Sequence, residues 1–154
     1  MGRMYSCSFQ NVAVTALQDF FEITAGDDEP VTIHAVHITQ GSDMGDAEEE
    51  GLRVAIIRGN TTSGSGGTAG TENPLDPKGG AASAAVELNN TTEASAGTEA
   101  VLHEEQINNR VGFHYIPTPE CRPKTDQSVL IVVRLLTAPA DALSVSGTVY
   151  WEEG

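Results

Sequence analysis

The segment Leu143-Ser144-Val145-Ser146-Gly147-Thr148-Val149-Tyr150-Trp151 decides the fold class of this 154-residue chain. Apolar side chains and one glycine occupy every second position of the segment, and Ser, Thr and Tyr occupy the positions between them. Successive side chains of an extended strand point to opposite faces, so this alternation predicts a β-strand with one face in the core. Trp151 falls on the apolar face, and we therefore expect it to be a core residue.

The same alternation recurs on both sides of this segment and predicts an all-β protein. The run Val129-Leu130-Ile131-Val132-Val133 differs because it is continuously apolar, which indicates a strand that is covered on both faces or buried at the centre of a sheet. The one helical competitor, at residues 46–51, is too short to be convincing. The predicted strands span residues 12–16, 19–24, 31–39, 51–58, 84–89, 99–105, 110–116, 128–136 and 143–152.

Eight or nine strands joined by Gly- and Pro-rich turns are typical of a two-sheet β-sandwich, for which a jelly roll is the eight-stranded arrangement. An immunoglobulin-like sandwich is the alternative. A chain of 154 residues builds one ordinary core and is short for two. We therefore expect a single domain over residues 1–154.

A low-complexity window from Asn60 to Ala100 lies between strand-rich halves. Of its 41 residues, 30 are Gly, Ser, Thr, Ala or Asn, and none is aromatic. Weak strands at its far end leave residues 60–83 as a predicted long loop. Such a loop buries little apolar surface on its own, so we expect a partner to order it. Its Gly64-Ser65-Gly66-Gly67 has no following Lys and no helix behind it, which favours conformational freedom over a phosphate site.

The charge balance is strongly acidic, with 8 Lys and Arg against 22 Asp and Glu and a formal net charge of -14. This surface makes free nucleic acid a poor partner. The acids cluster at residues 27–29, 43–50 and 152–153, and we interpret the clusters as solvated loops. Residues 43–50 would also offer oxygen ligands to calcium, but their spacing matches no calcium loop. No segment approaches the roughly 18 apolar residues of a membrane helix, so we expect no membrane partner and synthesis in a cytoplasm.

The four histidines do not form a recognisable metal motif. His34 and His37 are three residues apart in a predicted strand, so we expect their side chains on opposite faces, unable to share a metal ion. His103 and His114 are isolated in the sequence. We interpret all four as ordinary polar or packed residues and expect neither a metal nor a cofactor.

The chain also lacks the sequence signatures of nucleophilic catalysis. It contains no Gly-x-Ser-x-Gly elbow, and no serine or cysteine is placed by sequence beside a histidine and an acid. Cys7 and Cys121 allow at most one disulfide, and we interpret both as small buried apolar residues. We therefore expect a protein that is not an enzyme.

Turn-rich segments across the whole chain carry a resemblance to a known family. These segments are Gly51–Gly59, Thr62–Gly67, Pro74–Pro77, Ala138–Asp141 and Ser146–Thr148. In this combination the chain resembles the capsid decoration, or cement, proteins of tailed bacteriophages. The resemblance implies a non-enzymatic, β-rich homotrimer on the outer surface of the phage head, where it would bind the major capsid protein and stabilise its contacts. It also implies that the mature location is the virion.

A cement protein must add contacts across subunit seams, and we expect these contacts at two places. Residues 1–10 are expected to form an N-terminal arm that is exchanged with a neighbour, and the long loop is expected to dock on the capsid. The candidate partner-binding residues are Tyr5, Phe9, Thr62, Ser63, Leu75, Asp76 and Pro77.

Three other functions stay open from the sequence. A head-fibre, tail or baseplate module differs from a decoration protein chiefly in copy number. A cupin-like metalloenzyme is motivated by the fold class and the four histidines. A carbohydrate-binding module would stack Tyr150 or Trp151 on sugar rings.

Overall fold

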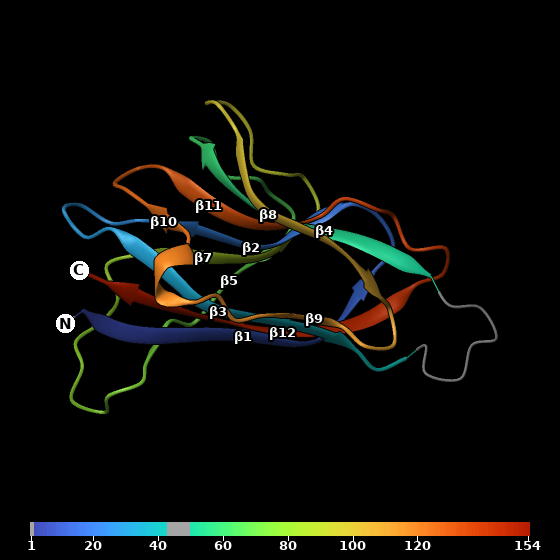
Figure 1. Ribbon diagram of the computed structural model, residues 1–154, viewed down its shortest axis with the longest axis horizontal. Coiled ribbons are helices and arrows are strands. Elements are labelled where there is room, and N and C mark those ends of the chain that lie inside the picture. The colour runs from blue at the N-terminus through green and yellow to red at the C-terminus, as the bar shows by residue number, and fades with distance from the viewer. Residues whose placement is uncertain (1, 43–49) are drawn as a thin grey trace.

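The computed structural model describes residues 2–42 and 50–154, which form two antiparallel sheets packed face to face (Figure 1). The predicted all-β, two-sheet sandwich is confirmed, and the jelly-roll winding stays a prediction. The acidic residues 43–49, with their calcium alternative and most of the short helical competitor, lie outside the described residues. Within the described part, the one helix is the short 3-10 helix η1 (Pro119–Cys121).

The two sheets have six strands each. Sheet A has the order β10 (Lys124–Thr125), β3 (Val31–Gln40), β12 (Leu143–Glu153), β1 (Arg3–Val14) and β6 (Asn73–Pro74), and β9 (Phe113–Tyr115) also pairs with β3. Sheet B has the order β5 (Thr68–Ala69), β7 (Ala85–Asn90), β2 (Gln18–Thr24), β11 (Leu130–Leu135), β4 (Gly51–Asn60) and β8 (Ala100–Asn108).

The strand β12 lies at the centre of sheet A, as the alternation of its sequence predicts. It pairs along its length with β1 on one side and with β3 on the other. Its side chains alternate strictly between buried and partly buried positions. Trp151 is fully buried and stacks on Tyr5 with ring centroids 5.7 Å apart, which confirms its place in the core.

The strand β11 is both covered on its two faces and located inside a sheet, which are the two alternatives that its apolar run predicts. It lies between β2 and β4 in sheet B, and all six of its side chains are buried. Ile131, Val133 and Leu135 belong to the core between the sheets. Leu130 and Val132 belong to a second apolar cluster on the outer face of sheet B, together with Ala55, Ile57 and Ala94.

The expected N-terminal arm and the predicted first strand at residues 12–16 are both wrong. Residues 3–14 form β1, which pairs with β12 of the same chain, so the segment is not a free arm. Tyr5, Cys7 and Phe9 point into the core, and the serines between them point outward. Burying these side chains in their own chain stabilises the fold, and their period of two in the sequence is the signal that could have identified the strand.

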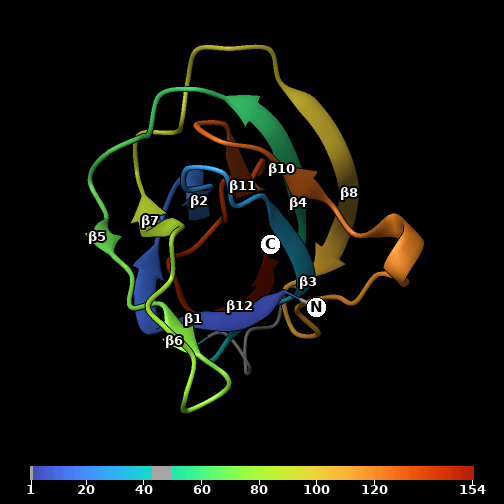
Figure 2. The same ribbon diagram turned by 90° about the vertical axis from the view of Figure 1, so that its left-hand side faces the viewer.

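The low-complexity window is ordered by its own chain, so the expectation that a partner is needed to order it is wrong. Residues 61–66 and 91–98 pair through isolated bridges between Thr62 and Ser95 and between Ser65 and Thr92. We call these two segments the cover, because Ala94 seals the apolar cluster on the outer face of sheet B. Figure 2 shows the two segments running together at the top of the view. The predicted loop at 60–83 also contains β5 and β6.

Close backbone contact explains the glycines of the cover. A Cβ on Gly64 would lie 1.9 Å from the carbonyl oxygen of Thr92, and a Cβ on Gly97 would lie 2.1 Å from the carbonyl oxygen of Gly59. Gly97 also has a φ of 71°, which side chains rarely adopt. Small residues here allow one backbone to lie directly against another.

A buried ion pair fastens the cover to sheet B. The Arg134 Nε lies 2.6 Å from Asp19 Oδ1, and Arg134 Nη1 donates to Glu99 Oε1 at 2.9 Å. The main chain of Ala94 joins the same group, because its N–H donates to Asp19 Oδ2 at 2.8 Å and its carbonyl accepts from Arg134 Nη2 at 3.1 Å. Burial alone would lower the pKa of Arg134, but its bonds to Asp19 and Glu99 raise it, so the guanidinium stays charged.

A second buried acid holds the other half of the cover. Glu22 Oε1 accepts the backbone N–H of Gly64 at 2.8 Å, and the side chain is buried. Burial raises the pKa of Glu22 to about 7, hydrogen bonds from Asn90 and Gly64 oppose the rise, and the nearby Asp19 adds to it. The carboxyl group is therefore half protonated near neutral pH.

Replacing Arg134 by Met should strongly destabilise the fold. The substitution leaves Asp19 buried without its cation, and removing one partner of a buried ion pair costs roughly 3–5 kcal/mol. Chemical denaturation measures this free energy of unfolding. Arg53 is the matched control, because its ion pair with Glu104 on the same sheet is exposed and Arg53→Met should cost about 1 kcal/mol or less. Equal losses in the two variants would contradict the assigned role of Arg134.

Replacing Glu22 by Gln should flatten the pH dependence of stability. The pKa of Glu22 is about 7 in the folded chain against a model-compound value of 4.5, so folding favours the protonated carboxyl group. Its stabilising contribution is complete below about pH 4.5 and is lost as the pH rises through about 7. Since a tenfold change in the acid constant corresponds to about 1.4 kcal/mol, the total loss is on the order of 3 kcal/mol.

Gln cannot ionise, so the unfolding free energy of E22Q should fall less than that of the wild type between about pH 5 and pH 8. Denaturant titrations at several pH values measure the difference. Glu120→Gln is the control, because Glu120 is exposed. Parallel pH profiles for the wild type and E22Q would disprove the protonated state of Glu22.

Candidate functional site

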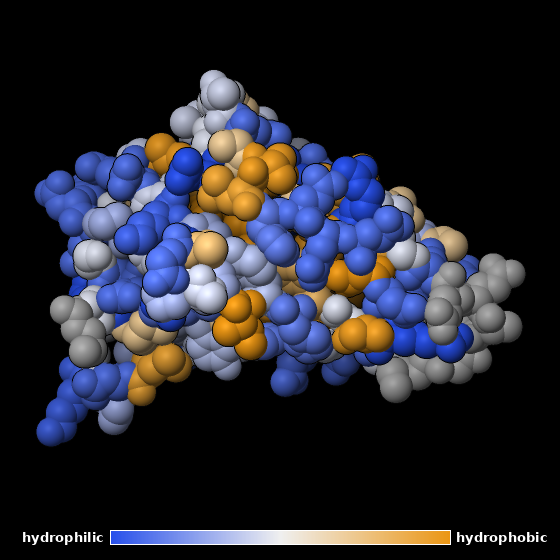
Figure 3. Space-filling model, viewed as in Figure 1, coloured by the Kyte–Doolittle hydropathy of each residue, from blue (hydrophilic) through white to orange (hydrophobic). Residues whose placement is uncertain are grey.

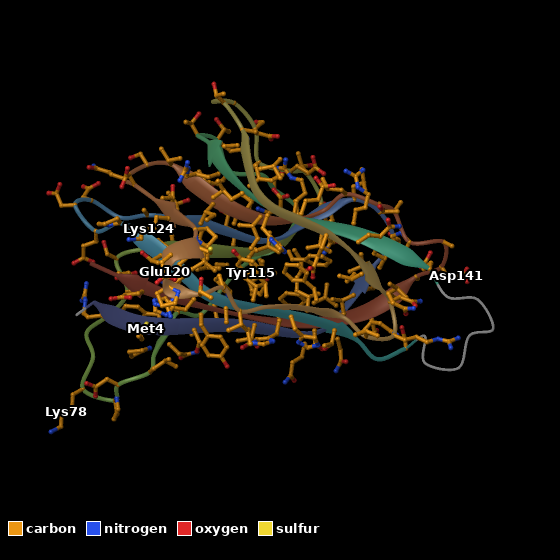
Figure 4. All side chains as sticks on the ribbon, viewed as in Figure 1. Met4, Lys78, Tyr115, Glu120, Lys124 and Asp141 are labelled. Carbon is orange, nitrogen blue, oxygen red and sulfur yellow. The ribbon has the colours of Figure 1, made fainter. Side chains whose placement is uncertain are left out.

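A hollow of about 420 Å³ opens between the start of β1 and the turn that follows β6. We call it the β1 groove. Figure 4 shows Lys78 at the tip of the projecting turn and Met4 on the strand beside it. The groove is lined by Gly2, Arg3, Met4, Tyr5, Pro74, Leu75, Asp76 and Gly79.

The projecting turn is held by its own hydrogen bonds. Asp76 Oδ1 accepts the N–H of Lys78 at 2.9 Å, and the Asp76 carbonyl accepts the N–H of Gly79 at 2.8 Å. The N–H of Leu75 donates to the Met4 carbonyl at 2.9 Å, which ties the turn to β1. Asp and Gly next to Pro are typical of tight turns for these reasons. The turn therefore presents Leu75 in a defined position.

Two buried side chains fix the returning half of the turn. The Tyr5 hydroxyl donates to the Gly80 carbonyl at 3.1 Å. The Glu153 carboxylate accepts the N–H of Ser83 at 3.0 Å and the N–H of Ala84 at 2.9 Å. Glu153 is a buried residue of β12, so the interpretation of residues 152–153 as a solvated loop is wrong. This anchor could not be predicted, because nothing in the local sequence shows which backbone amides a carboxylate at the end of a strand will meet.

The structure brings together some of the seven predicted partner-binding residues and separates the others. Tyr5, Leu75 and Asp76 line the β1 groove, and Pro77 is exposed in the turn. Tyr5 itself is fully buried, so it positions the turn, and its predicted contact with a partner is wrong.

The other three predicted residues lie away from the groove. Phe9 is buried between the sheets against Phe20 and Phe21, so its predicted partner contact is also wrong. Thr62 and Ser63 are exposed on the cover, which lies over the outer face of sheet B. The predicted docking loop is thus two separate surfaces.

The charged groups of the groove are engaged within the chain. Arg3 pairs with Glu29 at 2.5 Å and with the buried Glu153 at 3.5 Å, and its guanidinium carbon lies 5.8 Å from the centre of the Tyr5 ring. Asp76 is used by the turn. Leu75 is 51% exposed, so the groove offers a partner mainly an apolar side chain and main-chain groups. The groove therefore presents mainly apolar and main-chain groups to solvent.

A second apolar surface, which the sequence analysis missed, lies on the edge strand β8. Val101 is 55% exposed and Leu102 is 36% exposed. Figure 3 shows a mostly hydrophilic face on which the largest hydrophobic patch lies over β8. Alternation within β8 is weak, so its sequence did not show which side chains face solvent.

The predicted placement of His34 and His37 on opposite faces is wrong. Ile33 and Val36 both point into the core because the register of β3 against β12 shifts between them, which is a β-bulge. The extra residue puts both histidines on the outer face of sheet A. His34 bonds Glu152 there, with Nε2 to Oε2 at 2.8 Å, and the resulting hydrogen bond lowers the pKa of Glu152.

The two cysteines have different environments and are both free. Cys7 is buried as predicted, and burial raises the pKa of its thiol. Cys121 is exposed, so its predicted burial is wrong. Over residues 2–42 and 50–154, no group of three or more His, Cys, Asp or Glu side chains is placed to hold a metal ion. No helix in the same ranges is long and apolar enough to cross a membrane.

Comparisons of the chain with family models, with curated proteins and with solved structures gave no match.

Proposed function

We propose that this chain is a non-enzymatic structural protein of a phage virion, which decorates the outer surface of the head and stabilises contacts of the major capsid protein. The resemblance of its turn-rich segments to decoration proteins supports this function, as does the two-sheet sandwich. The observation that carries the proposal is the hydrogen-bonded projecting turn, in which Leu75 is exposed beside the β1 groove. A pre-formed turn docks with little loss of conformational entropy.

The open edge of β1 supplies a second docking element. β6 pairs with β1 only at Tyr5 and Ser6. Along residues 8–14, no other described strand forms a ladder on that side of β1. Unpaired main-chain groups at a sheet edge accept an added strand from a partner. The open edge and the β1 groove lie along the same strand on either side of β6, so each can contact a partner, whether it comes from the capsid protein or from another subunit of a homotrimer.

Particles of the phage that carries the gene should contain this chain in a copy number comparable to that of the major capsid protein. A decoration protein occupies repeated sites over the whole head, so its stoichiometry is high. Quantitative mass spectrometry of purified particles measures the ratio. Absence from particles would reject the virion role, and a few copies located at the tail would select the head-fibre, tail or baseplate alternative.

Replacing Leu75 by Ser should weaken rebinding of the purified chain to heads that lack it. Burying the exposed half of a leucine side chain contributes about 1–1.5 kcal/mol, so the affinity should fall roughly tenfold. Ile116→Ser is the matched control, since Ile116 is 70% exposed and lies outside the groove. If L75S binds with unchanged affinity and Val101→Ser binds more weakly, the docking face is instead the apolar surface on β8.

A further inference from the structure

Two histidine rings lie side by side on the outer face of sheet A, where the proposed docking function does not use them. His37 of β3 and His114 of β9 are directly opposite in the register of the two strands. Their Nδ1 atoms are 3.0 Å apart, and the ring centroids are 5.3 Å apart. Residues opposite one another on neighbouring strands share a face, so both rings point to solvent. The pair unites segments that are 77 residues apart in the sequence.

A neighbouring carbonyl fixes the tautomer of one ring. His114 Nε2 lies 3.2 Å from the carbonyl oxygen of Val111. A carbonyl can only accept, so Nε2 carries the proton and Nδ1 of the neutral ring has a free lone pair. His37 must then donate its own Nδ1–H to His114. Metal-binding histidines are typically oriented in this way, with the second ring nitrogen donating to a carbonyl or carboxylate.

The spacing of the two Nδ1 atoms suits one metal ion between them. An imidazole nitrogen binds a divalent metal at roughly 2.0–2.1 Å, so two nitrogens 3.0 Å apart subtend an angle of roughly 90° at the ion. Adjacent positions of a square-planar or tetragonal ion have this angle, and Cu²⁺ and Ni²⁺ prefer that geometry. We propose that His37 and His114 form a binding site for one divalent transition-metal ion, with Cu²⁺ bound more tightly than Ni²⁺ or Zn²⁺.

Binding requires a rotation of both rings, which turns the Nδ1 atoms from each other toward the ion, and a change of tautomer in His37. Its proton leaves Nδ1 and is replaced by one taken up from solvent at Nε2, so the neutral ring gains a lone pair at Nδ1 without a net change in charge. A neutral imidazole is the form that binds metal.

The surroundings leave room for the remaining ligands. His37 also lines a shallow hollow of about 170 Å³ on the same face. The remaining ligands of the ion would be water molecules, because the His114 side chain is exposed to solvent. Besides His37, the hollow is lined by Ser8, Phe9, Gln10, Thr39, Ser146, Gly147 and Thr148. No Lys or Arg side chain is part of this lining.

Calorimetric titration of the purified chain with Cu²⁺ tests the site. The wild type should bind one ion at the highest-affinity site. His37→Gln and His114→Gln should each weaken that affinity at least about tenfold. Loss of a residue that only hydrogen bonds to a metal ligand already costs about tenfold or more in metal affinity, and loss of a ligand itself should cost no less. His34→Gln is the matched control on the same strand and face, because His34 bonds Glu152, and it should bind like the wild type. Wild-type affinity in both H37Q and H114Q would overturn the proposal.

A measurement on the wild type avoids any effect of substitution on folding. Paramagnetic Cu²⁺ at a small fraction of the protein concentration broadens the NMR signals of the rings that bind it. The ring signals of His37 and His114 should vanish together, before those of His34 and His103. Earlier loss of the His34 or His103 signals, or equal broadening of all four, would reject the site.

Discussion

The buried pair of Asp19 and Arg134 is the interaction on which the outer half of the molecule depends. Sheet B carries apolar side chains on both faces, and only one face meets sheet A. The other face would be exposed unless the cover lay over it, and the cover has few apolar side chains of its own. The ion pair resolves this by binding the main chain of Ala94 from both its N–H and its carbonyl. A small apolar cluster and a buried charge network thus replace a third layer of structure.

The same solution recurs at the end of β12 in sheet A, where Glu153 binds the amides of Ser83 and Ala84. In both places a carboxylate on a strand accepts hydrogen bonds from backbone N–H groups of a loop segment. These bonds replace the hydrogen bonds to water that the segment loses when it packs on the sheet. Part of the acidic composition is therefore structural. The net charge counts these buried acids together with the solvated ones, so it does not show which acids stabilise the fold.

Strand periodicity made β12 and β11 predictable, because both alternation and a continuous apolar run depend only on local burial. The order of the cover could not be predicted in this way, since Thr62 pairs with Ser95 and Asp19 with Arg134 across long sequence separations. The face of His37 was predicted wrongly because a single bulge at His34 inverts the alternation. Of the candidate site, Leu75 and Asp76 were predictable from turn chemistry, whereas the anchors Tyr5 and Glu153 depend on tertiary contacts.

The glycines of the cover have a consequence for how this chain can change over time. A segment made of Gly, Ser and Thr resembles a linker in which almost any substitution is tolerated. Here a single added methyl group at Gly64 or Gly97 would collide with the backbone of the facing segment. Although the composition of this region is simple, substitutions at these two glycines should therefore be poorly tolerated. Drift in sequence should accumulate in the exposed side chains of the strands before it reaches these glycines.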